Sequence, residues 1–399
     1  ILSGLVGSEM CIRDRISGVP NADITISGGN IINGTSRADI LKGTADDDSF
    51  LGLAGNDTIY GYGGNDTLNG GAGKDKLYGG EGDDTYLIDL ASNQLEDAVT
   101  ENLSAGNDTI VARGTTTKTT TLFLKTNIEN LYVDEVTTNT GLWLNITGNT
   151  ENNILKGNSA SNILTGNGGA DTLDGGEGSD IYLIGQASDF LGDVISDTGT
   201  TGVDEVWFTT TKPSSFSVSD SNVSGIETVT AGKITSKTSI NIDASGYSSP
   251  LKIYGNAGAN SLSGGSGSDL LDGYAGNDIL TGGLGSDIFR FDTALNGQTN
   301  VDRIVDFALG VDQIQLNHVI FTRLAENATL NSDYFRSASD GLADPSAAGS
   351  NDFILYNSTT GDLFYDADGN GKGTAIKFAT VETAGSPPPL LTADSFNVI

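Results

Sequence analysis

A large apolar residue recurs at every ninth position between residues 34 and 87, in units that each begin with glycine. The six units place it at their eighth position: Leu41, Phe50, Ile59, Leu68, Leu77 and Tyr86. The first six residues of a unit suit a turn, because glycine tolerates positive φ angles and close backbone approach. The last three suit a short strand whose middle side chain points inward. Nine residues therefore make half a coil, and units eighteen residues apart stack on the same edge.

The same unit returns in two later blocks, residues 148–183 and 255–290, so that with residues 34–88 the chain holds three blocks. The inward positions of the later blocks are again apolar: Leu155, Leu164, Leu173, Tyr182, Leu262, Leu271, Leu280 and Phe289. Each block ends with an aromatic residue at this position, and atypical terminal repeats are expected at the ends of a solenoid.

Two spacers of similar sequence, residues 89–147 and 184–254, separate the blocks. Alternating Thr, Val, Ile and aromatic residues predict strands in both, so each is interpreted as a β-rich spacer. Residues 106–110, Gly-Asn-Asp-Thr-Ile, imitate a single repeat and predict a turn that leads into a strand.

The sixth position of every unit carries a side-chain oxygen that could bind a metal. These residues are Asp39, Asp48, Asp57, Asp66, Asp75, Asp84, then Asn153, Asn162, Asp171, Asp180, and finally Asn260, Asp269, Asp278, Asp287. Strands stacked about 4.8 Å apart bring these carboxylates together, and they repel unless a cation lies between them. Carboxylate and carbonyl oxygens in a flexible cage suit calcium better than magnesium, which keeps its waters. The pattern predicts up to about eight calcium ions, with weaker or merely capping positions where asparagine replaces aspartate.

The composition agrees with cation binding. The chain has 20 Lys+Arg against 52 Asp+Glu, and its net charge of −32 argues against nucleic acid or an anionic membrane as a partner. No apolar run approaches the roughly 18 residues of a membrane helix, so no membrane insertion is expected.

Residues 1–16 differ from the rest and contain the only methionine and the only cysteine, Met10 and Cys11. Residues 10–14 back-translate to a sequence that resembles a transposon-end adapter of sequencing libraries. We interpret residues 1–16 as an adapter artefact, with an ordinary N-terminal segment as the alternative, and residues 17–33 as a lead-in. Because the sequence begins at Ile1, without an initiator methionine or a visible secretory signal peptide, we expect a fragment of a longer protein.

The unit has the form G-G-x-G-x-D-x-U-x, with U apolar, as in residues 61–69 and 70–78. Together with residues 291–399, it resembles RTX proteins, which carry the hemolysin-type calcium-binding repeat, and specifically the C-terminal region of serralysin-type metalloproteases. The resemblance covers about residues 30–399. It implies an all-β fold: a right-handed parallel β-roll, or β-solenoid, that needs calcium and is followed by a C-terminal β domain at residues 291–399.

The same resemblance implies a secreted, extracellular bacterial protein that is exported by a type I (ABC transporter) system. The uncleaved signal would lie at the extreme C-terminus. Asp394, followed by Phe396, Val398 and Ile399, resembles the acidic and then apolar ending of that family, although Ser395 and Asn397 interrupt it.

Further acids follow the third block. Residues 366–371 imitate the start of an EF-hand loop, but Lys377 stands where a bidentate glutamate belongs, so we interpret them as a hairpin turn, with bound calcium as the alternative. Asp302, Asp306 and Asp312 could close the last coil and are interpreted as solvated loop acids.

The sequence offers no catalytic motif. A protease of the H-E-x-x-H type needs two histidines, whereas His318 is the only one here and is predicted to lie on a strand face. We favour a calcium-driven folding, export and display module that is not itself an enzyme. The alternatives are the C-terminal part of a secreted metalloprotease or other enzyme whose catalytic domain lies upstream, and an adhesin or surface-layer protein.

Overall fold

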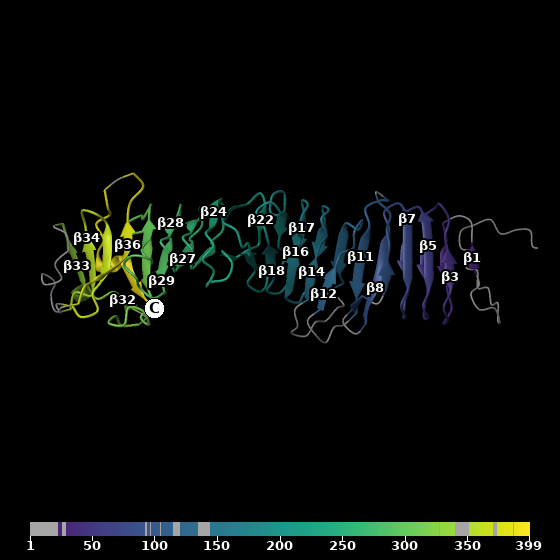
Figure 1. Cartoon of the computed structure of the whole chain (residues 1–399), viewed down its shortest axis with the longest axis horizontal. Helices are drawn as coiled ribbons and strands as arrows, with labels where there is room; N and C mark the ends of the chain where they lie inside the picture. The colour runs from purple at the N-terminus through teal and green to yellow at the C-terminus, as the bar shows by residue number, and fades with distance from the viewer. Residues whose placement is uncertain are drawn as a thin grey trace, which may run out of the picture. The chain divides into compact units, whose positions relative to one another are not determined.

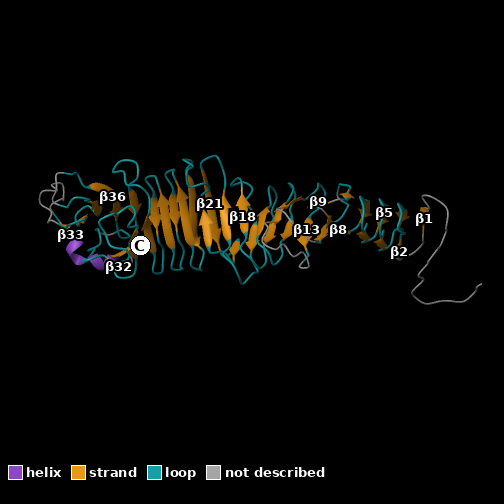
Figure 2. Cartoon of the chain, turned by 90° about the horizontal axis from the view of Figure 1, so that it is seen from below, coloured by secondary structure: helices purple, strands orange, loops and turns teal. Residues whose placement is uncertain are grey.

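A computed structural model describes residues 23–25, 29–91, 94–95, 97–103, 105–114, 120–134, 144–326, 328–339, 351–369, 373–385 and 387–399. The predicted adapter segment, residues 1–16, lies outside them. The described chain is all-β and coils into a parallel β-solenoid, as the sequence predicts (Figures 1 and 2). Within the described residues the only helical elements are two 3₁₀ turns, η1 (Ser332–Tyr334) and η3 (Ala393–Ser395).

The chain divides into two compact units, one of residues 1–181 with 192–202 and one of residues 182–191 with 203–399. In the first unit, alternate repeats of the first block enter two parallel sheets. One sheet contains β1 (Asp23–Thr25), β3 (Ile40–Lys42), β5 (Thr58–Gly63), β7 (Lys76–Glu81) and β10 (Ala98–Val99); the other begins with β2 (Ile31–Asn33), β4 (Ser49–Leu51), β6 (Thr67–Asn69) and β8 (Thr85–Ala91). The register pairs Leu41 with Ile59 and Phe50 with Leu68, so units eighteen residues apart do stack.

The coil continues through the first spacer instead of stopping at it. Its strands are β9 (Gln94–Leu95), β11 (Thr109–Arg113), β12 (Thr120–Phe123), β13 (Asn130–Val133) and β14 (Leu144–Thr147). The strands that follow in this unit are β15 (Ile154–Lys156), β16 (Asn162–Thr165) and β17 (Thr172–Asp174) of the second block and β19 (Val194–Ser196) of the second spacer. Ile110 of β11 pairs with Tyr86 of β8, and Leu131 of β13 pairs with Leu155 of β15. The spacer therefore adds turns of the same solenoid with longer connections.

The second unit repeats this arrangement. Its strands up to the end of the third block are β18 (Ile181–Ile184), β20 (Glu205–Phe208), β21 (Ser214–Ser219), β22 (Val223–Ser224), β23 (Thr228–Thr230), β24 (Ile240–Gly246), β25 (Lys252–Asn256), β26 (Ser261–Ser263), β27 (Leu270–Tyr274), β28 (Ile279–Thr281) and β29 (Ile288–Phe291). One parallel sheet contains, in order, β20, β23, β25, β27 and β29. The other contains β21, β24, β26 and β28.

The C-terminal residues complete the second unit. Their strands are β30 (Asp302–Ile304), β31 (Gln313–Leu316), β32 (Ala328–Thr329), β33 (Phe335–Ala338), β34 (Ile354–Asn357), β35 (Asp362–Tyr365), β36 (Ile376–Val381) and β37 (Phe396–Val398). β30 and β31 extend the two sheets, and β36 and β37 pair with them in parallel. β35 and β36 are antiparallel, so residues 366–375 connect a hairpin, as predicted; residues 370–372 lie outside the described part.

The core is the column of inward side chains. All fourteen predicted inward residues are buried, and none is more than 2 % exposed. Ile32 of β2, in the lead-in, is buried in the same way, so the solenoid begins before the first predicted repeat. Fully burying such a side chain stabilises the fold by about 1.5–3 kcal/mol, which makes this column the main apolar contribution of the repeats.

Candidate metal centre

Aspartates of the first block form two ladders along the two edges of the coil. In each ladder the backbone N–H of one aspartate donates to Oδ1 of the aspartate eighteen residues later. The bonds are Asp39 to Asp57 (2.8 Å), Asp57 to Asp75 (2.7 Å), Asp48 to Asp66 (2.7 Å) and Asp66 to Asp84 (2.7 Å). These carboxylates are all buried.

The later blocks use the same bond. The N–H of Asn153 donates to Asp171 (2.7 Å) and that of Asn162 to Asp180 (2.5 Å) in the first unit. In the second unit, Asn260 donates to Asp278 (2.7 Å) and Asp269 to Asp287 (2.9 Å). The predicted residues are thus brought together in pairs of turns on one edge, each within its own block.

A second hydrogen bond, to Oδ2 of an aspartate or to the single oxygen Oδ1 of an asparagine, divides these turns into two classes. In six of them this side-chain oxygen accepts the N–H of the residue four places earlier, which is the second residue of the same repeat, at 2.6–2.9 Å. We call these closed turns; their side chains are those of Asp39, Asp48, Asn153, Asn162, Asn260 and Asp269. They are the first two repeats of each block.

In the other eight turns, which we call open turns, the second residue of the repeat has a positive φ. These residues are Leu53 (78°), Tyr62 (82°), Gly71 (85°), Gly80 (118°), Asn167 (73°), Gly176 (88°), Tyr274 (61°) and Gly283 (96°). In six of the eight, Oδ2 of the aspartate is buried without a hydrogen-bond partner: Asp57, Asp66, Asp75, Asp84, Asp278 and Asp287. A positive φ is uncommon for residues such as leucine and tyrosine and marks strain that surrounding structure must maintain.

The asparagines suit closed turns for a chemical reason. Oδ1 of Asn260 accepts the N–H of Asn256 at 2.8 Å, while its Nδ2 donates to the carbonyl oxygen of Ile240 at 2.8 Å. An aspartate could not donate this second bond. The asparagine side chain thus pairs with one backbone N–H and one backbone carbonyl oxygen, and it carries no charge that a cation would have to neutralise.

Electrostatics make the open turns unfavourable without a counter-ion. Burial, opposed by the hydrogen bond from Asp48 and reinforced by the carboxylates of Asp84 and Asp48, raises the pKa of Asp66 to about 7. Burial is also the largest cause that raises the pKa of Asp57 and of Asp84 to about 6. A bound cation would reverse this balance by favouring the charged form.

Several acids outside the repeats join the ladders; sequence reasoning missed three of them and considered the other two, Asp302 and Asp312, only as an alternative. Each accepts the N–H of the last aspartate before it on the same ladder, at 2.8–3.0 Å. The pairs, donor first, are Asp75 and Asp97, Asp84 and Asp108, Asp171 and Asp193, Asp278 and Asp302, and Asp287 and Asp312. Asp302 and Asp312 are buried, so their interpretation as solvated loop acids was wrong. Insertions break the nine-residue spacing at these places, but each acid still stands two residues before an inward apolar residue, a signal that could have found them.

The segment at residues 106–110 is a turn into β11, as predicted, and Asp108 is one of these additional ladder acids. The single histidine contacts the last residue of the sequence. His318 lies in a turn after β31 and not on a strand face, and its Nδ1 is 2.7 Å from the carbonyl oxygen of Ile399.

The fold and the site together define a class: a parallel β-solenoid whose glycine-rich turns stack buried carboxylates along each edge. The sequence matches the RTX calcium-binding nonapeptide repeat at four places, residues 25–59, 51–86, 147–182 and 254–289. These matches include all fourteen predicted site residues, so the chain carries RTX repeats, which bind calcium. A search of curated proteins finds no match to the chain. Within the described residues, no helix has the length and apolar character needed to cross a membrane.

Proposed function

We propose that this chain is a calcium-driven folding module of a secreted bacterial protein, exported by a type I (ABC transporter) system, and that it catalyses no reaction itself. The observation that carries the proposal is the set of buried Oδ2 atoms in the open turns that have no hydrogen-bond partner. A buried, unpaired carboxylate oxygen is unfavourable unless a cation or proton satisfies it. Calcium fits because all the available ligands are oxygens.

The proposal predicts that folding depends on calcium. The repeats bury one large apolar residue in nine, which cannot offset the ordering entropy of a chain with net charge −32. An ion that binds only the folded form stabilises it by about 4 kcal/mol per site when its concentration is a thousandfold above Kd. The open turns number four, two and two in the three blocks, in keeping with up to about eight ions.

Circular dichroism during a calcium titration tests this prediction. The protein should be disordered in excess chelator and gain the spectrum of a β protein as calcium is added. Magnesium at the same concentrations is the control and should have little effect, since it retains its waters. A complete β spectrum in chelator would show that the fold does not need calcium.

Export is the second part of the proposal and rests on the family resemblance of residues 291–399. A cytosol poor in calcium would keep the chain unfolded for passage through a narrow transporter, and calcium outside would fold it. The serralysin-like character of this region is part of the same proposal.

A further inference from the structure

We propose that Glu101, together with Asp84 and Asp108, forms an additional three-carboxylate calcium site where the first spacer leaves the first block. The choice of calcium as the cation rests on the proposed function; the geometry of the site does not. Glu101 comes from the spacer and not from a repeat, so the nonapeptide pattern does not predict it.

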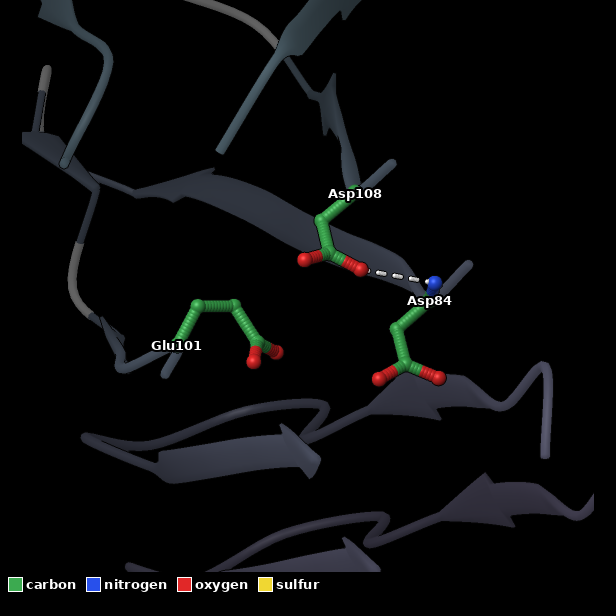
Figure 3. Close-up of side chains that lie close together, drawn as sticks. All are labelled: Asp84, Glu101 and Asp108. Atoms are coloured by element: carbon green, nitrogen blue, oxygen red, sulfur yellow. Dashed lines mark hydrogen bonds between the residues drawn. The ribbon is translucent and has the colours of Figure 1, made fainter. Parts of the chain in front are cut away.

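The three side chains converge from separate segments (Figure 3). Asp84 precedes β8, Glu101 follows β10, and Asp108 precedes β11. One oxygen of each lies within 4.8 Å of the others, and the side chains are buried, with Glu101 only 8 % exposed. This spacing suits three oxygens around one cation with Ca–O distances of about 2.3–2.6 Å.

The hydrogen bonds leave oxygens free for that cation. Oδ1 of Asp108 accepts the N–H of Asp84 at 2.8 Å, and Oε2 of Glu101 accepts the N–H of Asn102 at 3.2 Å. Oδ2 of Asp84 and Oε1 of Glu101 are both buried without a hydrogen-bond partner. Backbone donors thus orient the carboxylates while one oxygen of each of these two remains available.

No positive side chain compensates the cluster. Among the described residues, neither lysine nor arginine forms an ion pair with any of the three acids. Burial, and then the carboxylates of Asp108 and Asp84, raise the pKa of Glu101 to about 8, as expected for a third close negative charge.

The spacing of the cluster recurs in the sequence. Glu101 stands 17 residues after Asp84 and 7 before Asp108, and Asp197 stands 17 residues after Asp180 and 7 before Asp204. The ends of the first and second blocks therefore share an acid at the same position in the spacer that follows. This recurrence argues that the acid has a function and that the three carboxylates do not lie together by chance.

The test compares Glu101→Gln with the wild-type chain by equilibrium dialysis against calcium, with elemental analysis of the bound ions. Glutamine keeps the size and the acceptor oxygen but removes the charge. We expect either one ion fewer or, in a titration, one site whose Kd rises at least about tenfold. Glu81→Gln, at an exposed position at the end of β7, is the matched control and should leave the ion count unchanged.

Asp108→Asn provides a second, independent removal of charge from the same site. It should lose the same ion, and the double variant Glu101→Gln/Asp108→Asn should lose one ion and not two. Circular dichroism in saturating calcium checks that each variant folds; if Glu101→Gln does not, Asp108→Asn decides alone.

An unchanged ion count and affinity in Glu101→Gln, or separate losses that add in the double variant, would overturn the three-carboxylate site. A wild-type chain that binds no calcium would instead refute the proposed function, so the two failures are distinguishable.

Discussion

At the scale of single residues, the second position of each repeat separates the open turns from the closed turns. In the closed turn of Asp48, the N–H of Thr44 occupies the side-chain oxygen at 2.7 Å. In the open turn of Asp66, eighteen residues on, Tyr62 has a φ of 82° and Oδ2 of the aspartate has no hydrogen-bond partner. We therefore expect an aspartate in a closed turn to be a weaker calcium ligand than one in an open turn, because the backbone of its own repeat competes for the oxygen.

The pair Asp66→Asn and Asp48→Asn tests this distinction on one ladder. Each variant replaces one carboxylate by an amide of similar size. We expect Asp66→Asn to lose at least one calcium ion, since the open turn relies on charge, and Asp48→Asn to keep all of them. Calorimetric counting of bound ions measures the difference; equal losses in the two variants would show that turn conformation does not select the calcium ligands.

The raised pKa values predict how protons act on the metal-free protein. The pKa of Asp66 is about 7 in the fold and about 4 in an unfolded chain, so the folded form holds more protons between these values. The free energy of unfolding of the metal-free protein should therefore increase as pH falls from about 8 to 5, and this gain is lost as pH rises through 7.

Circular dichroism of protein stripped of metal on a chelating resin measures this effect. The β signal should be greater at pH 5 than at pH 8. Asp57→Asn/Asp66→Asn, with two fewer buried carboxylates, should show a weaker dependence. A β signal that falls on acidification would contradict the assignment of these carboxylates as the groups that oppose folding without metal.

At the scale of strands and turns, the sequence predicts strands in the blocks and in the spacers, but it predicts their register only in the blocks. In a block, glycine spacing and one inward apolar residue set the strand and its register together, as for β6 on β4. In a spacer, the turn lengthens outward and the spacing is lost, yet the acid and the inward residue persist, as in Asp108 and Ile110. Stacking needs only the hydrogen bond to the acid and the packing of the inward apolar residue. A search for a strict nine-residue spacing therefore misses these turns.

The same reasoning explains which parts of the site were missed. A fixed sixth position identifies fourteen side chains but cannot say in which of them the backbone already occupies an oxygen. That depends on the φ of a neighbouring residue, and at Leu53 or Tyr62 no local preference predicts a positive value. Glu101 was missed because its partners come from turns on either side of an insertion.

At the scale of the whole chain, the predicted export signal is part of the folded structure. β37 pairs in parallel with β31 and antiparallel with β32, and Phe396 and Val398 are no more than 1 % exposed. The tail is thus buried in the folded form. A transporter that reads it would have to do so before calcium folds the last turns.

Export and folding can be separated by two changes on opposite sides of this contact. Deleting Leu391–Ile399 removes both the predicted signal and β37, so the protein should remain in the cytosol of a host with a type I exporter. Ile314→Ala keeps the tail sequence but removes a buried side chain of β31 that pairs with Phe396. A buried Ile→Ala change costs about 2–5 kcal/mol, so this variant should still be exported while less of it folds outside.

Immunoblots of cells and medium measure export, and resistance to protease in calcium measures folding. Full secretion of the deletion would place the signal elsewhere, and retention of Ile314→Ala would show that the transporter requires more than the unfolded tail.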